Sequence, residues 1–216
     1  GAYLYSNLGF ALLAQTVATS QSEDFHTLLR QTILSELDMH HTVIVRLLGP
    51  RMSRLPMGYD LATGSPVPVK TAGASGFPAM GGAGAIVSTP KDMMRWLRWN
   101  MGLRAEDPLN DLLPALQTPS TRTTTGPGGK GSELGLSWFI AKQSPPRSPA
   151  YDLVWKDGLI PGFSSFICLS SSESPGKTPS DYGCFVLTNS EKNGPNALYL
   201  LCTELMEIMR SPDAPD

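Results

Sequence analysis

The sequence predicts an α+β fold in which a helical region precedes an antiparallel sheet that is closed by a C-terminal helix. In the first part of the chain, apolar residues recur at helical spacing. After a Thr- and Gly-rich tract at residues 122–132, short runs of β-branched and aromatic residues alternate with Gly, Pro and Ser, a pattern typical of strands. We therefore expect a mainly helical region, residues 1–132, and a sheet region, residues 133–216, that together form part of one domain.

The composition narrows the classes of function. The chain has 216 residues, of which 41% are hydrophobic, enough to bury a sizeable core. Its net charge of −2 gives no basic stripe of the kind that nucleic-acid binding needs. No run of about 18 apolar residues is present, so no membrane span is expected. The first residues do not read as a signal peptide.

Three cysteines, Cys168, Cys184 and Cys202, are distributed over the second half of the chain. They are too few and too scattered for a disulfide framework or a zinc site. We expect three buried, reduced thiols, with one disulfide as the alternative. Neither a metal site nor a cofactor is predicted.

Two helices are expected near the start of the chain. The first covers residues 8–19, and the second covers residues 23–37, where apolar side chains recur at helical spacing. Ser20 and Glu23 have the spacing of a capping box for the second helix. The core positions expected in the first helix are Leu8, Leu12, Leu13 and Val17.

The rest of the helical region contains one well-marked helix and two irregular stretches. Thr89 is placed to cap the third helix, Pro90 occupies its first position, and Gly102 follows its end. Residues 46–79 lose their periodicity and fill with Pro and Gly, which predicts a binding loop or a rim. The tract at residues 122–132 is expected to be a mobile surface loop.

The sheet region is predicted to be an antiparallel meander, because successive strands are joined by short polar links. The four candidate strands are residues 134–141, 153–155, 166–169 and 183–188. An amphipathic helix follows at residues 195–210. Its expected core positions are Leu198, Leu201, Leu205, Ile208 and Met209.

Two short segments carry residues suited to chemistry. Lys156, Asp157 and Gly158 follow a predicted strand, and a Gly there lets a backbone or a ligand approach closely. The simpler interpretation is a surface ion pair at the mouth of a hairpin. Tyr5 and Asn7 precede the first helix, where Asn is an ordinary cap. A phenol acts as a base near neutral pH only if a cation lowers its pKa, and Lys156 is a candidate for that cation.

Four segments, taken in order, resemble the class C β-lactamase and DD-peptidase group, which also contains related esterases and acyltransferases. They are YSNLGFALL, ELDMHHT, GGAGAIVSTPKDMMRWL and the strand carrying Lys-x-Gly, and together they extend over essentially the whole chain. Tyr5-Ser6-Asn7 matches the Tyr-x-Asn motif of that group. Lys156-Asp157-Gly158 matches its Lys-Thr-Gly motif except at the central residue. The resemblance implies a β-lactamase/transpeptidase-like fold.

The resemblance also implies an acyl-enzyme mechanism, in which a Ser of a Ser-x-x-Lys motif attacks a carbonyl group. Tyr5 would then be the general base, and Lys156 would hold it as a phenolate or contact the ligand. The backbone N–H of Leu159 would supply half of the oxyanion hole. The implied substrate-binding positions are Asn7, Asp157 and Gly158.

The nucleophile is not found in the expected place. The family motif lies upstream of Tyr-x-Asn, whereas the two matches here, at residues 88–91 and 174–177, lie downstream. We interpret both as coincidental, because the first coincides with a helix cap and the second lies in a Gly- and Pro-containing loop. The chain is thus expected to be the C-terminal part of a serine hydrolase and inactive alone. A missing N-terminal segment or separate chain would supply the serine.

Asp157 stands where the family has a Thr that helps to bind a substrate carboxylate. An ionised Asp would repel that carboxylate, so we expect a preference for uncharged or amine-bearing small-molecule or peptide substrates. Alternatively, Asp157 pairs with Lys156 or a nearby Arg and never meets the substrate. Acyl transfer by the same fold, or a catalytically inactive scaffold, are the other functions left open. For a bacterial family member, the compartment would be the periplasm or the exterior.

Overall fold

The computed structural model describes most of the chain. The described residues are 3–69, 80–104, 107–122, 132–146, 149–173, 175–177, 179–191 and 194–211. The predicted mobile loop at residues 122–132 falls almost wholly outside these ranges, as does the last part of the irregular stretch at residues 46–79.

The centre of the fold is a six-stranded antiparallel sheet in the order β10-β9-β8-β7-β6-β5. Each strand pairs with its neighbour in sequence, so the predicted meander is confirmed. The strands are β5 (Thr121–Arg122), β6 (Glu133–Leu134), β7 (Phe139–Gln143), β8 (Tyr151–Ile160), β9 (Phe163–Ser171) and β10 (Tyr182–Thr188).

Strands β8 and β9 are longer than predicted. The Gly- and Pro-rich segment between the two apolar runs continues the ladder as far as the pair Ile160–Phe163, so the connecting turn is only Pro161-Gly162. Gly162 has φ +82°, a conformation that glycine adopts without a steric penalty. Lys156, Asp157 and Gly158 therefore lie within a strand, and their placement at a hairpin mouth was wrong.

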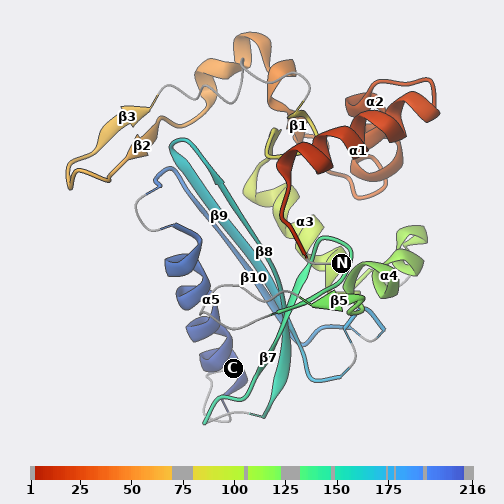
Figure 1. Ribbon diagram of the computed structural model, residues 1–216, viewed down its shortest axis with the longest axis vertical. Helices are drawn as coiled ribbons and strands as arrows, with labels where there is room; N and C mark the ends of the chain where they lie inside the picture. The colour runs from red at the N-terminus through yellow and green to blue at the C-terminus, as the bar shows by residue number, and fades with distance from the viewer. Residues whose placement is uncertain are drawn as a thin grey trace.

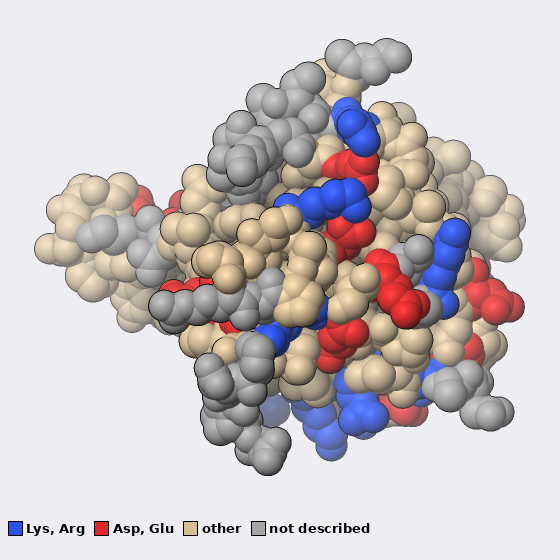
Figure 2. All heavy atoms as spheres, turned by 90° about the horizontal axis from the view of Figure 1, so that it is seen from below, with Lys and Arg blue, Asp and Glu red and all other residues tan. Residues whose placement is uncertain are grey.

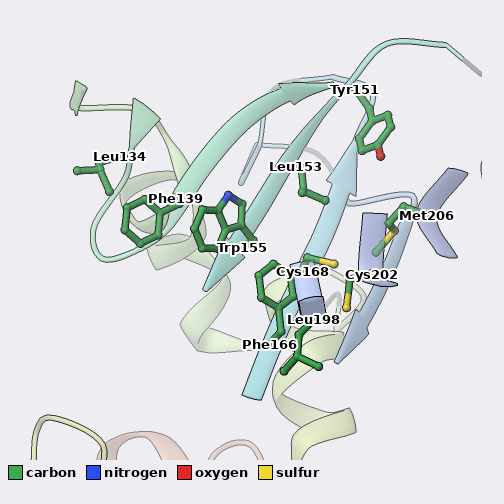
Figure 3. Close-up of a cluster of buried hydrophobic side chains, with 10 residues drawn as sticks. All are labelled: Leu134, Phe139, Tyr151, Leu153, Trp155, Phe166, Cys168, Leu198, Cys202 and Met206. Atoms are coloured by element: carbon green, nitrogen blue, oxygen red, sulfur yellow. The ribbon is translucent and has the colours of Figure 1, made fainter. Parts of the chain in front are cut away.

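Two helices cover the sheet, α5 (Gly194–Arg210) on one face and α3 (Pro90–Asn100) on the other (Figure 1). The core under α5 contains Trp155, Phe166 and Leu198, and Figure 3 shows these side chains between the strands and the helix. The core under α3 contains Leu97 and Val154. This two-sided burial explains why residues 153–155 of β8 and residues 166–169 of β9 are continuous apolar runs. The arrangement confirms the α+β fold.

The buried face of α5 differs from the prediction. Leu198, Cys202 and Met206 are buried at spacings of four residues, whereas the expected core residues Leu201, Leu205 and Ile208 are 44%, 38% and 53% exposed. The apolar residues cover more of the helix than one face. The sheet selects the stripe that contains the cysteine and the methionine, two side chains that fill irregular core space well.

Helix α3 is built as predicted. The Thr89 hydroxyl accepts a hydrogen bond from the backbone N–H of Asp92 at 3.2 Å, Pro90 is in the first turn, and Gly102 has φ +72° after the end. Asp92 is fully buried and accepts hydrogen bonds from the His41 N–H at 2.8 Å and the Thr42 hydroxyl at 2.9 Å. The Asp92 carboxylate in the first turn of α3 thus also fixes the segment before β1.

Helix α1 (Asn7–Ser20) presents an unexpected face to the protein. The buried residues are Ala11, Ala14 and Ala18. The predicted core positions Leu8, Leu12, Leu13 and Val17 are instead 71%, 65%, 54% and 43% exposed. The cause is a close backbone approach. A Cβ atom at Gly82 would lie 2.4 Å from the Ala14 Cβ atom, so only a face of small residues fits there.

The second predicted helix is divided into α2 (Phe25–Leu29) and a π-helical segment, η1 (Arg30–Leu34). Asp24 caps it, accepting hydrogen bonds from the N–H groups of His26 and Thr27. The predicted capping box is wrong, because the Ser20 hydroxyl donates to the Val17 carbonyl instead. An Asp is as good a cap as a Ser, and Asp24 directly precedes the first residue of α2, whereas Ser20 lies four residues earlier.

The stretch expected to be irregular contains short regular elements. They are η2 (Val45–Leu47), η3 (Gly49–Arg54) and a hairpin of β2 (Gly58–Asp60) and β3 (Val67–Val69). The hairpin lies beside the β8–β9 turn (Figure 1), and the Tyr59 N–H donates to the Asn189 carbonyl at 3.0 Å. The remaining short elements are β1 (Val43–Ile44), β4 (Ile86–Val87), η6 (Pro108–Leu112) and α4 (Leu113–Gln117).

The surface and the helix lengths agree with the composition. Figure 2 shows acidic and basic side chains intermingled on the face seen from below. Among the described helices, none has both the length and the hydropathy needed to cross a bilayer.

Candidate active site

The structure brings Tyr5 and Lys156 together, although Tyr5 lies near the start of the chain and Lys156 lies in β8. Tyr5 lies in the extended segment before α1 and is 51% exposed. The Lys156 ammonium nitrogen lies 5.5 Å from the centroid of the Tyr5 ring and 5.8 Å from that of the Phe139 ring. A cation at this distance is attracted by the ring and raises the local positive potential at the phenol.

Lys156 also forms an ion pair with its neighbour. Its Nζ atom donates to the backbone carbonyl of Asp157 at 2.5 Å and to the Asp157 Oδ1 atom at 3.0 Å. The Lys156 and Asp157 side chains are 30% and 26% exposed, so the pair is mostly shielded from water. The pairing that the sequence left open for Asp157 is therefore present. An ammonium group has three donors, and these contacts use two of them.

The strand that carries this pair has an open edge. Among the described residues, strand β7 pairs with residues 151–155 of β8, whereas residues 156–160 pair with β9 alone. Leu159 lies in the open part and is 51% exposed. An unpaired strand edge presents backbone N–H and C=O groups that can bind another extended chain or a carbonyl group.

Gly158 leaves room for a side chain of the next strand. A Cβ atom at this position would lie 2.5 Å from the Ser165 Oγ atom on β9 and 3.9 Å from its Cβ atom. A larger residue at position 158 would therefore require the Ser165 hydroxyl to rotate away.

Asn7 does not cap the first helix. Ser6 is the N-cap, and its hydroxyl accepts a hydrogen bond from the Gly9 N–H at 2.9 Å. Asn7 is the first helical residue, exposed, two positions after Tyr5. Among the described hydrogen bonds and ion pairs, none joins Asn7 to Lys156 or Asp157. The structural role that the sequence suggested for Asn7 is therefore filled by Ser6.

The first Ser-x-x-Lys match does not have the arrangement of a nucleophile. Ser88 shares a hydrogen bond of 2.8 Å with the Thr42 hydroxyl, and Lys91 is exposed. Thr89, between them, is occupied in capping α3. The second match begins at Ser174, which lies outside the described residues.

Two aromatic residues near Lys156 were missed by the sequence reasoning. Tyr3 meets Phe139 edge to face, with the ring centroids 6.4 Å apart. Burial, followed by the charges of Tyr5 and Asp157, raises the pKa of Tyr3 above its usual value. Phe139 stacks on Trp155 with ring centroids 4.5 Å apart. Alternation of Tyr3 and Tyr5 in an extended segment was the available signal.

The cysteines are not scattered in space. The Sγ atoms of Cys168, Cys184 and Cys202 all lie within 4.8 Å of one another, although their sequence positions indicated that they are too scattered for a zinc site. All three are free thiols, as expected, with Cys168 and Cys202 buried and Cys184 half-buried. Strand pairing and the docking of α5 bring together residues whose sequence spacing has no metal-site pattern.

Comparisons with curated proteins identify β-lactamases. The chain is 29% identical over 215 residues to a β-lactamase of Pseudomonas fluorescens, covering 90% of this chain and 56% of that protein. It is 29% identical over 222 residues to a β-lactamase of Psychrobacter immobilis, covering 89% of this chain and 49% of that protein. The chain thus spans about half the length of these relatives.

Solved structures show the same fold. A β-lactamase/D-alanine carboxypeptidase from Yersinia pestis superposes with a TM-score of 0.68 at 22% identity, over 94% of this chain and 54% of that one. An octameric penicillin-binding protein homologue from Pyrococcus abyssi gives 0.71 at 19% identity, over 98% and 45%. The Beta-lactamase family model matches residues 1–201. This chain therefore belongs to the Beta-lactamase family.

Proposed function

We propose that this chain is the C-terminal part of a β-lactamase-like serine hydrolase that acts through an acyl-enzyme on amide, ester or β-lactam carbonyls. The observation that carries the proposal is the Lys156 ammonium group, 5.5 Å from the Tyr5 ring and beside an open strand edge. Tyrosine, lysine and unpaired backbone donors are the groups that acyl transfer requires around a serine. Membership of the Beta-lactamase family supports the same assignment.

In the proposed mechanism, the serine oxygen attacks the substrate carbonyl while Tyr5 accepts the proton of the serine hydroxyl. The Lys156 ammonium group stabilises the negative charge that develops in the site, or contacts the ligand directly. The backbone N–H of Leu159 donates to the developing oxyanion, a contribution of about 3 kcal/mol for one such donor. Tyr5 then returns the proton to the leaving group, and a water molecule releases the acyl group in a second cycle.

The serine is proposed to come from a further segment or a separate chain that packs on the exposed face of α1. That face carries large apolar side chains that soluble proteins seldom leave uncovered as a group. Its most exposed members are Leu8, Phe10, Leu12, Leu13 and Val17, and the exposed Leu4 lies just before the helix. The chain also spans only about half of its relatives, 56% and 49% of their lengths. Alone, the chain is proposed to lack acylating activity.

The preferred substrates are proposed to be uncharged esters or amides, or molecules bearing an amine. Asp157 occupies the position at which the family motif has a Thr, and it lies on the strand segment with the open edge. Its ion pair with Lys156 reduces the positive charge that would attract a carboxylate. Both effects disfavour anionic substrates.

The Lys156–Asp157 ion pair also supports a second candidate function, a catalytically inactive β-lactamase-like binding or scaffold protein. A lysine that is held by an adjacent carboxylate polarises a tyrosine less than an unpaired lysine does. Transfer of the acyl group to an alcohol or amine instead of water remains a variant of the first proposal, since the same groups would serve it.

One experiment separates the two candidates. The full-length natural protein and this chain alone are each incubated with a fluorophosphonate and with a β-lactam, and their intact masses are measured. A serine hydrolase gives a covalent adduct on the full-length protein that Tyr5→Phe slows, whereas this chain alone gives none. An absence of adduct on the folded full-length protein with either reagent would support the scaffold.

A further inference from the structure

The three cysteines form a compact group of sulfur atoms that the proposed mechanism does not use. Cys168 and Cys184 are directly paired on β9 and β10, with their Sγ atoms 3.5 Å apart. Cys202 approaches from α5, and all three Sγ atoms lie within 4.8 Å of one another. Figure 3 shows Cys168 and Cys202 between the sheet and the helix, with Met206 nearby.

The distances suit three-coordinate metal binding. A metal–sulfur bond of about 2.3 Å places three sulfur atoms around one ion at separations of about 4 Å. The Sγ separations here range from 3.5 Å to no more than 4.8 Å and so bracket that value. Small side-chain rotations would close the triangle without moving a strand.

The donor set selects a soft ion. Among the described residues, the group contains three thiols and neither a carboxylate nor an imidazole. Met206, one turn beyond Cys202 on α5, belongs to the same buried cluster and could add a thioether. Thiolate and thioether ligands favour Cu(I) and zinc, whereas carbonyl and carboxylate oxygen atoms favour Mg²⁺ and Ca²⁺.

The number of ligands distinguishes Cu(I) from zinc. The described residues of this group offer three thiols, whereas structural zinc sites are almost always four-coordinate. Cysteine binds metal ions as the thiolate, so each ligand releases its proton when the ion enters. Cys168 and Cys202 are fully buried beside Trp155 and Phe166, so the ion would be shielded from water.

We propose that Cys168, Cys184 and Cys202 form a binding site for one Cu(I) ion, which links β9, β10 and α5. Bound Cu(I) would stabilise the docking of α5 on the sheet, because α5 and the two strands each supply a ligand. The half-buried Cys184 would be the point of entry for the ion.

The test uses the full-length, reduced protein under anaerobic conditions. Cu(I) is titrated in competition with a chromophoric Cu(I) chelator, and thermal unfolding is followed with and without one equivalent of the ion. The expected result is one tightly bound ion that raises Tm. Cys184→Ser and Cys202→Ser should each weaken binding at least about 100-fold, since each removes a ligand.

Val186→Ala is the matched control, because Val186 lies on β10 and packs against the same core but offers no sulfur. It should lower Tm and leave Cu(I) affinity unchanged. If the cysteine variants do not fold, native-state alkylation of the wild type replaces them. One equivalent of Cu(I) should then protect Cys184 from iodoacetamide at least tenfold.

The proposal is overturned by any of four results. These are no Cu(I) binding or protection, binding that survives both serine substitutions, zinc binding as tight as Cu(I) binding, or a Cys168–Cys184 disulfide that persists in the protein isolated with reductant present.

Discussion

Lys156 hydrogen-bonds to two oxygen atoms of Asp157 while its ammonium group lies 5.5 Å from the Tyr5 ring. The same cation therefore faces a carboxylate that neutralises it and a phenol that it could activate. Which partner dominates decides how the proposed site functions. The first two predictions address these partners separately.

Replacing Tyr5 by Phe removes the proposed base but keeps the ring beside Lys156. For the full-length protein acting on a p-nitrophenyl ester, we expect kcat/KM to fall by about 10²–10⁴-fold, the usual contribution of general acid–base catalysis. Tyr3→Phe is the control, since Tyr3 lies in the same segment as Tyr5 but packs against Phe139. An equal loss in both variants would indicate a structural role for the segment.

Replacing Asp157 by Thr releases Lys156 and removes a negative charge from the strand edge. A carboxylate about 6 Å from another, at an effective dielectric constant of about 20, costs between 2 and 3 kcal/mol, or about 100-fold in rate. We therefore expect the ratio of nitrocefin to p-nitrophenyl ester hydrolysis to rise by roughly 10–100-fold. An unchanged ratio would mean that Asp157 never meets the substrate.

Replacing Asp92 by Asn should destabilise the protein by about 3 kcal/mol, because Asp92 is fully buried and its Oδ1 atom lies 3.2 Å from Arg95 Nη1. An Asn side chain would also place its NH₂ group against groups that now donate hydrogen bonds to Asp92. The measurement is urea unfolding. Asp111→Asn, at an exposed position, should change the stability by less than about 0.5 kcal/mol.

Replacing Gly162 by Ala should be more harmful than the same change at Gly64. Both have positive φ, +82° and +86°, and each change therefore carries a conformational cost of about 1 kcal/mol. At Gly64 a Cβ atom meets nothing within 4 Å, whereas at Gly162 it lies 2.8 Å from the Gly58 Cα atom. We expect about 1–3 kcal/mol of additional loss at Gly162, measured by thermal unfolding. Equal losses of stability in the two variants would show that the β2–β3 hairpin, which carries Gly58, moves aside freely.

Asp181 should make stability acid-sensitive. Partial burial raises its pKa, but hydrogen bonds from Arg210 and Ser172, with the Arg210 charge, outweigh burial and hold the pKa below its usual value. A lowered pKa in the folded state gives stabilisation that is present above the unfolded pKa of about 3.9 and is lost as the pH falls through the folded value.

The urea midpoint should accordingly drop between pH 6 and pH 3, and Asp181→Asn should reduce that drop. Glu204→Gln, an exposed change on α5, should leave the drop as in the wild type. A drop of the same size in Asp181→Asn would assign the acid sensitivity to other carboxylates.

Local signals in the sequence determined several elements of this protein. Thr89, Pro90 and Gly102 define α3 because capping and backbone conformation act within a few residues. The meander follows from short polar links between strands, which allow only neighbouring antiparallel pairing. The motif segments likewise identified the family before any contact was known.

Tertiary structure decided which faces and which partners those elements use. The leucines of α1 point outward because Gly82 admits only the alanine face, a constraint from a loop far along the chain. Cys168, Cys184 and Cys202 meet only after β10 pairs with β9 and α5 docks. Lys156 meets Tyr5 for the same reason: long-range packing, which no periodicity within one segment encodes, brings β8 beside the segment before α1.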